Sequence, residues 1–267
     1  MARIGLVAGY GELPILFADA AKAKGETVIA FGLKGLTSDE LAKHVDKIHW
    51  LEWGGLKKGL LLLAVERIGQ IALLGKIKKE IFLKNDDRFD DEAKKIFGKN
   101  KDKKDYTLLG EVAKLLQSVG VKVIDLTAYL GDLIPSKGTL TKTAPAESEW
   151  EDVRYGEHIG RELARLDIGQ TVAVRDKTVI SVEAVEGTDE AIRRAGALAK
   201  QGFVVVKMAR PEQDMRFDVP LIGLDTLKAV VEAGAKVLAF EEKKTLLMNR
   251  EEMVKFADEN GVAIVVI

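Results

Sequence analysis

The sequence has no cysteine among its 267 residues. This excludes disulfide bonds, thiolate nucleophiles and cysteine-ligated zinc, and it permits a reducing cytoplasm. Histidine is scarce: the three are His44, His49 and His158, and none has the spacing of a metal-binding motif. The sequence also lacks a G-x-S-x-G nucleophile elbow. What remains is chemistry based on carboxylates and a hard cation, for which magnesium or manganese is better suited than zinc.

The sequence also lacks a charge imbalance and a long apolar run. Lys plus Arg number 41 and Asp plus Glu 42, so the formal net charge is -1 and offers no global attraction to nucleic acid or an acidic membrane. The N-terminal apolar stretch is too short for a signal peptide, and the apolar run at 60–65 is far below the length of a membrane span. We therefore expect a cytoplasmic protein with no nucleic-acid partner and at most peripheral membrane contact.

The first half of the chain alternates short apolar strands with helical patterns. Such alternation is typical of a parallel, doubly wound sheet, and it predicts a Rossmann-like domain over residues 1–133. The expected strands are 4–8, 27–31, 44–50, 70–74 and 121–126, and the expected helices are 13–23, 56–68 and 106–119. The densely charged segment 84–105 interrupts this pattern, either as a solvated helical excursion or as a mobile lid or flap.

The second half has a different pattern. Residues 134–146 are rich in Pro, Gly, Ser and Thr and are expected to form a linker. Beyond it, hairpins mix with crossovers, which predicts a mixed-sheet α/β domain over residues 147–267. The expected helices are 147–166, 189–200, 224–233 and 250–260, and the expected strands are 171–174, 179–184, 203–208, 214–222, 236–240, 245–248 and 262–267.

The segment 213–220 alternates polar and apolar residues with a period of two. As a strand it would place Asp214, Arg216 and Asp218 on one face. Two carboxylates beside a guanidinium suit work on a charged, oxygen-rich group such as a phosphate ester. A solvated face that neutralises its own charges is the alternative.

A glycine-containing motif, residues 9–14, follows the first expected strand and opens the first helix. Glycines let a backbone approach a ligand, and a helix N-terminus favours an anion, so Gly9, Gly11 and Leu13 are predicted to contact a phosphate or nucleotide. A purely structural turn is the alternative. NAD is disfavoured because the motif is only half of the dinucleotide fingerprint and the second strand ends without an acidic residue.

Three further places carry candidate binding residues. Gly75 and Lys76 end the fourth expected strand, where doubly wound sheets bind ligands, although a surface lysine after a turn is the alternative. Glu186, Gly187, Thr188 and Asp189 are candidate binding residues where a helix opens. Glu183 and Glu186 are the acids that are candidates to contact a cation, sugar hydroxyls or water, whereas Thr188 also suits a simple helix cap and Asp189 complements the helix dipole. Lys207, at the end of an apolar strand, is suited either to diphosphate charge or to capping.

These motifs, in this order, resemble one family. They comprise residues 5–14, 166–170, 182–189, Gln213, 216–220 and 222–223. The set resembles the UDP-2,3-diacylglucosamine pyrophosphatases of lipid A biosynthesis, of the type unrelated to metallophosphoesterases, over nearly the whole chain.

The resemblance implies a two-domain enzyme that uses Mg²⁺, with Mn²⁺ as a possible substitute, to cleave the substrate diphosphate into UMP and 2,3-diacylglucosamine 1-phosphate. The family's essential aspartate corresponds to Asp218, which would anchor the metal or orient water, in a cleft between the domains. Gln170, Gln213 and Arg216 would contact substrate, and a homodimer through the C-terminal domain is expected. The alternatives are another nucleotide-sugar enzyme, such as an NAD-dependent oxidoreductase, and a non-catalytic nucleotide- or lipid-binding module.

Overall fold

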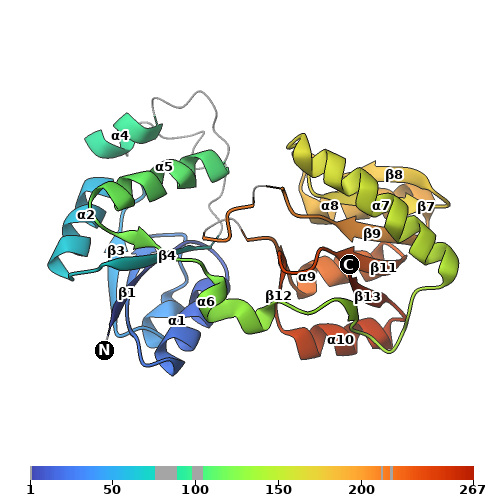
Figure 1. Cartoon of the computed structure of the whole chain (residues 1–267), viewed down its shortest axis with the longest axis horizontal. Helices are drawn as coiled ribbons and strands as arrows, with labels where there is room; N and C mark the ends of the chain where they lie inside the picture. The colour runs from blue at the N-terminus through green and yellow to red at the C-terminus, as the bar shows by residue number, and fades with distance from the viewer. Residues whose placement is uncertain (1, 76–88, 98–104, 212, 217–218) are drawn as a thin grey trace. The chain divides into compact units, whose positions relative to one another are not determined.

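The computed structural model describes residues 2–75, 89–97, 105–211, 213–216 and 219–267. The chain forms two compact units. Unit 1 comprises Met1–Gly131 together with Met215–Asp218, and unit 2 comprises Asp132–Asp214 together with Val219–Ile267. Both are α/β units (Figure 1).

Unit 1 is built on a five-stranded sheet with the order β3-β2-β1-β4-β5, and its strand pairings are parallel. Its strands are β1 (Arg3–Ala8), β2 (Thr27–Leu33), β3 (Lys47–Leu51), β4 (Gln70–Leu74) and β5 (Lys122–Val123). Its helices are α1 (Leu13–Ala23), η1 (Asp39–Lys43), α2 (Leu56–Val65), α4 (Asp91–Phe97), α5 (Asp105–Ser118) and α6 (Thr127–Leu130), followed by η2 (Gly131–Leu133). The strand order reverses between β1 and β4, as in Rossmann-like folds. The expected fold class of the first half is confirmed.

The sheet of unit 1 is covered on both faces, which is why its central strands are almost continuously apolar. All but the first residue of β1 and the two ends of β2 are buried or nearly so. Helix α1 packs against β1 and β2. Helices α2 and α5 share a separate core with β2 and β4, in which Leu63 and Leu116 contact the layer that contains Phe31 and Ile71. These helices lie on the opposite face from α1 (Figure 1).

Unit 2 is built on a mixed six-stranded sheet with the order β6-β13-β11-β9-β7-β8. Its strands are β6 (Gly138–Thr139), β7 (Thr171–Arg175), β8 (Thr178–Val182), β9 (Phe203–Lys207), β11 (Ala235–Phe240) and β13 (Ala263–Val266), and β10 (Leu221–Ile222) pairs separately with β12 (Leu246–Leu247). Its helices are α7 (Glu147–Arg165), α8 (Thr188–Ala199), α9 (Leu224–Glu232) and α10 (Arg250–Glu259). The expected mixed-sheet class is confirmed.

The β7–β8 hairpin forms where the sequence predicts it. Asp176 and Lys177 adopt φ of 50° and 54°, as a two-residue hairpin turn requires. The Asp152 carboxylate accepts hydrogen bonds from both of their N–H groups, at 2.8 and 2.7 Å. A buried side chain of α7 therefore stabilises a turn of the sheet.

Helix α7 lies unusually close to the sheet of unit 2. A Cβ atom at Gly156 would lie 2.7 Å from Val206, and one at Gly160 would lie 2.7 Å from Met208. The two glycines are four residues apart and therefore face the same side of the helix. On the other face, α8, α9 and α10 bury Ile192, Val230 and Met253 in a second apolar core.

Several expected elements differ in the structure. In the described part of the expected strand 214–222, Met215 and Arg216 form a turn, 214, 219 and 220 have no regular structure, and Leu221–Ile222 is the part that is extended and paired. Residues 217–218 lie outside the described residues. The backbone groups of this segment bond elsewhere, since Leu126 N donates to Met215 O at 3.3 Å, and Pro220 has no N–H to offer. Part of the expected linker 134–146 is β6, an edge strand paired with β13. Of the charged segment 84–105, α4 and the start of α5 are seen, and residues 84–88 and 98–104 lie outside the described residues.

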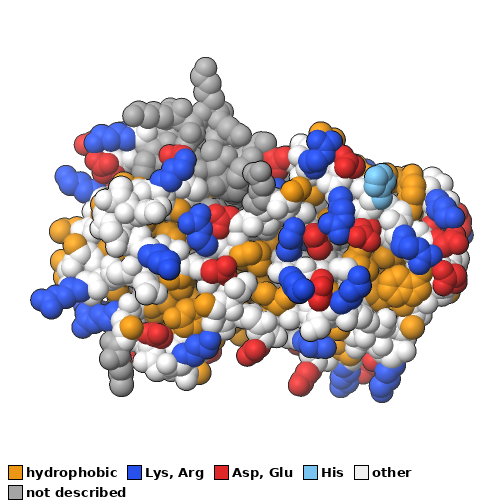
Figure 2. All heavy atoms as spheres, in the orientation of Figure 1, with side chains coloured by type: hydrophobic (Ala, Val, Ile, Leu, Met, Phe, Trp, Pro, Cys, Tyr) orange, Lys and Arg blue, Asp and Glu red, His pale blue; other side chains and the backbone are white. Residues whose placement is uncertain are grey.

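Side chains of both charges are interspersed on the face shown in Figure 2, in keeping with the net charge of -1. In the described part of the chain, no helix is both long enough and apolar enough to cross a bilayer.

In unit 1, the buried carboxylate of Glu66 contacts three basic side chains. Glu66, at the end of α2, accepts a hydrogen bond from Lys47 Nζ, lies 2.7 Å from His49 Nε2 and is 3.7 Å from Arg3 Nη1. These contacts connect α2 to the starts of β1 and β3. The hydrogen bond from Lys47, followed by that from His49, lowers the pKa of Glu66 below its usual 4.5.

Because the pKa of Glu66 is lower in the folded state, its charge stabilises the fold above pH 4.5, and this contribution disappears as the pH falls through the lower folded value. We expect Glu66→Gln to unfold at a lower urea concentration than wild type at pH 7, and the difference to narrow below pH 4.5. Urea titrations at several pH values measure this. The control is Glu12→Gln, at an exposed position, and a pH-independent difference for Glu66→Gln would contradict the assignment.

Candidate functional site

The glycine turn after β1 lies at the carboxyl ends of β1 and β4. Gly9 N donates to Leu74 O at 2.7 Å, and Gly75 has φ of +97°. A Cβ atom at Gly75 would lie 2.7 Å from the Gly9 carbonyl carbon, so no side chain fits. The structure thus brings together Gly9 and Gly75, at the edge of the sheet where doubly wound folds bind ligands. Lys76 lies outside the described residues.

The other predicted residues of this turn differ in their surroundings. Gly11 has φ of +109° with open space around it. This conformation favours glycine and leaves room for a ligand. Leu13 is buried in the first turn of α1, next to Pro14. Leu13 packs into the core, so any contact that it makes with a polar ligand must come from its backbone.

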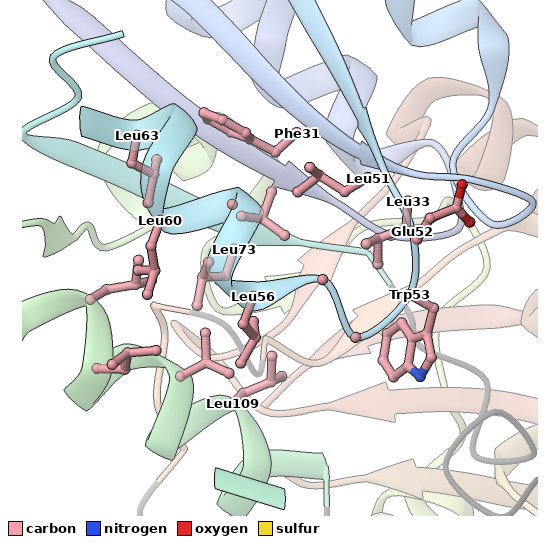
Figure 3. Close-up of a pocket in the computed structure, with 18 of the residues that line it drawn as sticks. Phe31, Leu33, Leu51, Glu52, Trp53, Leu56, Leu60, Leu63, Leu73 and Leu109 are labelled. Atoms are coloured by element: carbon pink, nitrogen blue, oxygen red, sulfur yellow. The ribbon is translucent and has the colours of Figure 1, made fainter. Parts of the chain in front are cut away.

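An apolar cavity of about 140 Å³ lies between this edge of the sheet, α2 and α5; we call it the α2–α5 cavity (Figure 3). Apart from Glu52 and Trp53, its lining side chains are aliphatic, Phe or glycine. In Figure 3, Glu52 and Trp53 lie at one end and Leu63 lies at the other. Walls of this kind suit a small apolar ligand.

A polar cluster in unit 2 contains several of the residues that the sequence predicts. Lys207, buried at the end of β9, donates from Nζ to Thr188 Oγ1 at 3.1 Å. Thr188 Oγ1 donates to Glu183 Oε1 at 3.2 Å, and Glu183 Oε2 accepts from Gln170 N at 3.4 Å. We call Gln170, Thr171, Glu183, Thr188 and Lys207 the Thr188 cluster.

Strand register and backbone conformation assemble this cluster. Thr171 is paired directly with Lys207 between β7 and β9, and Thr171 Oγ1 lies 3.5 Å from Thr188 Oγ1. Gly187 precedes α8 with φ of 87°, which glycine tolerates. The cluster therefore combines a buried ammonium group with the N-terminus of a twelve-residue helix, two features that favour an anion.

Gln170 has an acceptor that the protein does not use. Its Oε1 atom is buried and has no hydrogen-bond partner among the described residues. Buried acceptors are normally satisfied by protein, water or a ligand. An incoming hydroxyl or N–H group would supply the missing partner.

Glu186 and Asp189, which were predicted with Thr188, bond elsewhere. Glu186 accepts from Ala184 N at 3.2 Å and pairs with Arg194, and its pKa is lowered by its own backbone N–H and then by Arg194. Asp189 Oδ1 accepts from Thr226 Oγ1 at 2.9 Å, which joins α8 to α9. In this structure both carboxylates bond to other protein groups, Glu186 to Arg194 and Asp189 to Thr226.

The predicted residues of the 213–220 segment divide between the two units. Gln213 closes a turn with Arg210, since Gln213 N donates to Arg210 O at 3.1 Å and Gln213 Oε1 accepts from Arg210 N at 3.1 Å. Arg216 is exposed and belongs to unit 1. Asp218, the predicted catalytic residue and metal ligand, lies outside the described residues.

The sequence predictions missed the α2–α5 cavity and Thr171, whereas Glu183 was one of the two acids predicted to contact a cation, sugar hydroxyls or water. The leucines of α2 and α5 match an ordinary core pattern, and Gly59 in the middle of α2 was the one signal of a cavity. In the parts of the chain that the structure describes, no group of three or more His, Asp or Glu side chains is placed to hold a metal ion.

The fold and both sites define a two-unit α/β protein with a Rossmann-like N-terminal unit. Residues 3–133 match the LpxI N-terminal domain and residues 136–265 match the LpxI C-terminal domain. The chain belongs to the LpxI family.

Among characterised proteins, the chain is similar to UDP-2,3-diacylglucosamine pyrophosphatase LpxI of Caulobacter vibrioides, with 27% identity over 275 aligned positions that cover 99% of this chain and 97% of the relative. Two solved structures also align: biotin carboxylase from Campylobacter jejuni, with TM-score 0.25, 12% identity and 73% of this chain covered, and Rhizobium etli pyruvate carboxylase, with TM-score 0.28, 17% identity and 74% covered. The alignments span 42% and 16% of those chains, and scores this low carry no structural argument.

The Thr188 cluster depends on a glycine at position 169. A Cβ atom there would lie 2.1 Å from the Glu183 carbonyl oxygen. We expect Gly169→Ala to displace the loop that carries Glu183 and to lower the free energy of unfolding by about 1–3 kcal/mol or more. Urea unfolding measures this, with Gly223→Ala as the control because Gly223 has an ordinary extended φ of -130° and open space around its Cβ position. Equal stability of the two variants would show that the contact is not tight.

Proposed function

We propose that this protein hydrolyses the diphosphate bond of UDP-2,3-diacylglucosamine, a step of lipid A biosynthesis, to UMP and 2,3-diacylglucosamine 1-phosphate. The observation that carries the proposal is the match of both halves of the chain to the LpxI domains, together with a pyrophosphatase relative aligned over 99% of this chain. The two LpxI domains match in order along this chain.

We infer that Asp218 is the catalytic carboxylate and a ligand of Mg²⁺, with Mn²⁺ as a substitute. Mg²⁺ prefers oxygen ligands and needs only one or two protein carboxylates when substrate phosphates supply the others. Asp214, four residues earlier and half-buried, is a second carboxylate in the same segment. When bound, the cation neutralises the charge that develops on the phosphate oxygens. Asp218 would hold it or orient the attacking water.

The described residues supply binding groups for the polar part of the substrate. Backbone N–H groups at Gly11 and Gly75 would contact the nucleotide side, and Gly9, whose N–H bonds to Leu74 O, would let the ligand approach its backbone closely. Lys207 would lie near the diphosphate, with Thr188 fixing the position of its ammonium group at 3.1 Å. Gln170 Oε1 would accept a hydrogen bond from a substrate hydroxyl or N–H group. Glu183 accepts a hydrogen bond from the same Thr188 hydroxyl, which fixes the orientation of that hydroxyl.

We further propose a homodimer formed through unit 2 and a cytoplasmic location. The substrate carries two acyl chains, so the enzyme would meet it at a membrane surface by peripheral contact. Two alternatives are an NAD-dependent enzyme and a binding module without activity. Measuring UMP release from UDP-2,3-diacylglucosamine distinguishes both from this proposal.

Asp218→Ala is expected to lower the rate of UMP release about 10³-fold, equivalent to ~4 kcal/mol of transition-state stabilisation, while substrate still binds. The assay follows UMP released from UDP-2,3-diacylglucosamine in the presence of Mg²⁺. Removing Mg²⁺ with EDTA should abolish release by wild type, and adding Mg²⁺ or Mn²⁺ back should restore it.

Asp132→Ala is the control because Asp132 is exposed and lies in η2. Activity of Asp218→Ala within about threefold of wild type would refute the assignment, and binding without turnover by wild type would indicate the binding module.

Lys207→Met shortens the side chain by one atom, keeps an apolar stem and removes the charge. We expect the KM for the substrate to rise about 10- to 100-fold, since a hydrogen bond to a charged group contributes about 1.5–3 kcal/mol. Steady-state kinetics on UDP-2,3-diacylglucosamine measure this, with the partly exposed Lys228→Met as the matched control in unit 2. If kcat and KM both stay at wild-type values, the Thr188 cluster does not bind the diphosphate.

A further inference from the structure

We propose that the α2–α5 cavity holds the terminal carbons of one acyl chain of the substrate, and that Gly59 determines how much of the chain the cavity admits. The inference rests on the proposed function, because it assigns the hydrocarbon part of that substrate to a particular place in unit 1.

The walls of the cavity select an apolar occupant. The side chains that face it from α2 and α5 include Leu60, Leu63, Leu109 and Leu116, and polar atoms of side chains are confined to the end with Glu52 and Trp53 (Figure 3). A sugar or nucleotide placed there would lose its hydrogen bonds to water without replacement. A hydrocarbon chain has no such groups and gains from leaving water.

Gly59 is an unexpected residue at its position. It lies inside α2, where glycine is less favourable than alanine, and its φ is not in the left-handed region. A Cβ atom there would meet only Leu51 Cδ1, at an ordinary 3.5 Å, so packing does not demand glycine either. Because Gly59 lines the cavity, the effect of having no side chain there is to keep the space open. A locally unfavourable residue with no structural reason is typical of a functional position.

The cavity adjoins the edge of the sheet where the polar part of the substrate is proposed to bind. Gly9 and Gly75 line the cavity as well as forming the glycine turn. A chain in the cavity and a phosphate group at the turn would therefore be neighbours. Its volume of about 140 Å³ is close to that of cavities that hold a single benzene molecule, so only a few terminal carbons fit and the cavity would measure chain length.

The test compares UDP-2,3-diacylglucosamine carrying dodecanoyl chains with the same compound carrying butanoyl chains. Each methylene that enters the cavity should change KM about fourfold. We expect Gly59→Leu to raise KM for the dodecanoyl substrate about 10-fold or more and to leave the butanoyl substrate unchanged. The matched control is Gly110→Leu, which also replaces a helical glycine, has open space around it and does not line the cavity. Equal KM values for Gly59→Leu and Gly110→Leu on both substrates would overturn the proposal.

Two more variants keep the test decisive if Gly59→Leu does not fold, as thermal melting followed by circular dichroism would show. Gly59→Ala should melt at a higher temperature than wild type and raise KM for the dodecanoyl substrate by a smaller factor. Leu60→Ala enlarges the cavity from the α2 side and should favour a hexadecanoyl over a dodecanoyl substrate more than wild type does. If neither variant changes the dependence on chain length, the proposal is wrong.

The source of the hydrocarbon and the proposed function are tested separately. Brominated dodecanoate alone is a probe for free fatty acid, because bromine in the cavity would quench the fluorescence of Trp53. Quenching that Gly59→Leu abolishes, with no effect of chain length on KM, would assign the cavity to a free lipid and overturn the substrate assignment. Absence of UMP release by wild type on every substrate would refute the proposed function, whereas release without chain-length dependence would refute only this inference.

Discussion

Both polar sites depend on backbone segments that approach each other too closely for a side chain between them. In unit 1, Gly75 lies against the backbone of Gly9, and in unit 2, Gly169 lies against the carbonyl of Glu183. Such contacts fix neighbouring loops without using any polar side chain. The N–H groups of the first site and the Lys207–Thr188–Glu183 chain of the second are thereby held in position before a ligand arrives, which lowers the entropy lost on binding.

Much of the fold was predictable because the parallel strands are buried on both faces. The continuous apolar runs of β1 and β2 and the hairpin at Asp176 identified the two kinds of sheet. Among the described residues, the strand expected at 214–222 forms only at Leu221–Ile222, because alternation in a sequence cannot show whether a neighbouring strand is available. There, Met215 instead accepts a hydrogen bond from Leu126, far away in the sequence.

The candidate sites were predictable in part. Gly9, Gly75, Thr188 and Lys207 could be found because glycines at strand ends, helix starts and charges after apolar strands have local signatures. The Thr171–Lys207 pairing depends on strand register, which only the folded sheet defines. The cavity is the space that the leucine side chains of α2 and α5 do not fill. Its volume depends on their packing in three dimensions, which the periodicity of the sequence does not reveal.

The chain leaves unit 1 after Gly131, returns to it at Met215 and leaves again after Asp218. Met215, whose carbonyl oxygen accepts a hydrogen bond from Leu126 N, is therefore synthesised more than eighty residues after the rest of unit 1. By that time most of unit 2 has been made. Although domains generally fold in order during synthesis, the first unit can be completed only after residues 132–214 of the second have been made. A gene fragment that stops after Gly131 would therefore encode unit 1 without the acceptor for Leu126 N.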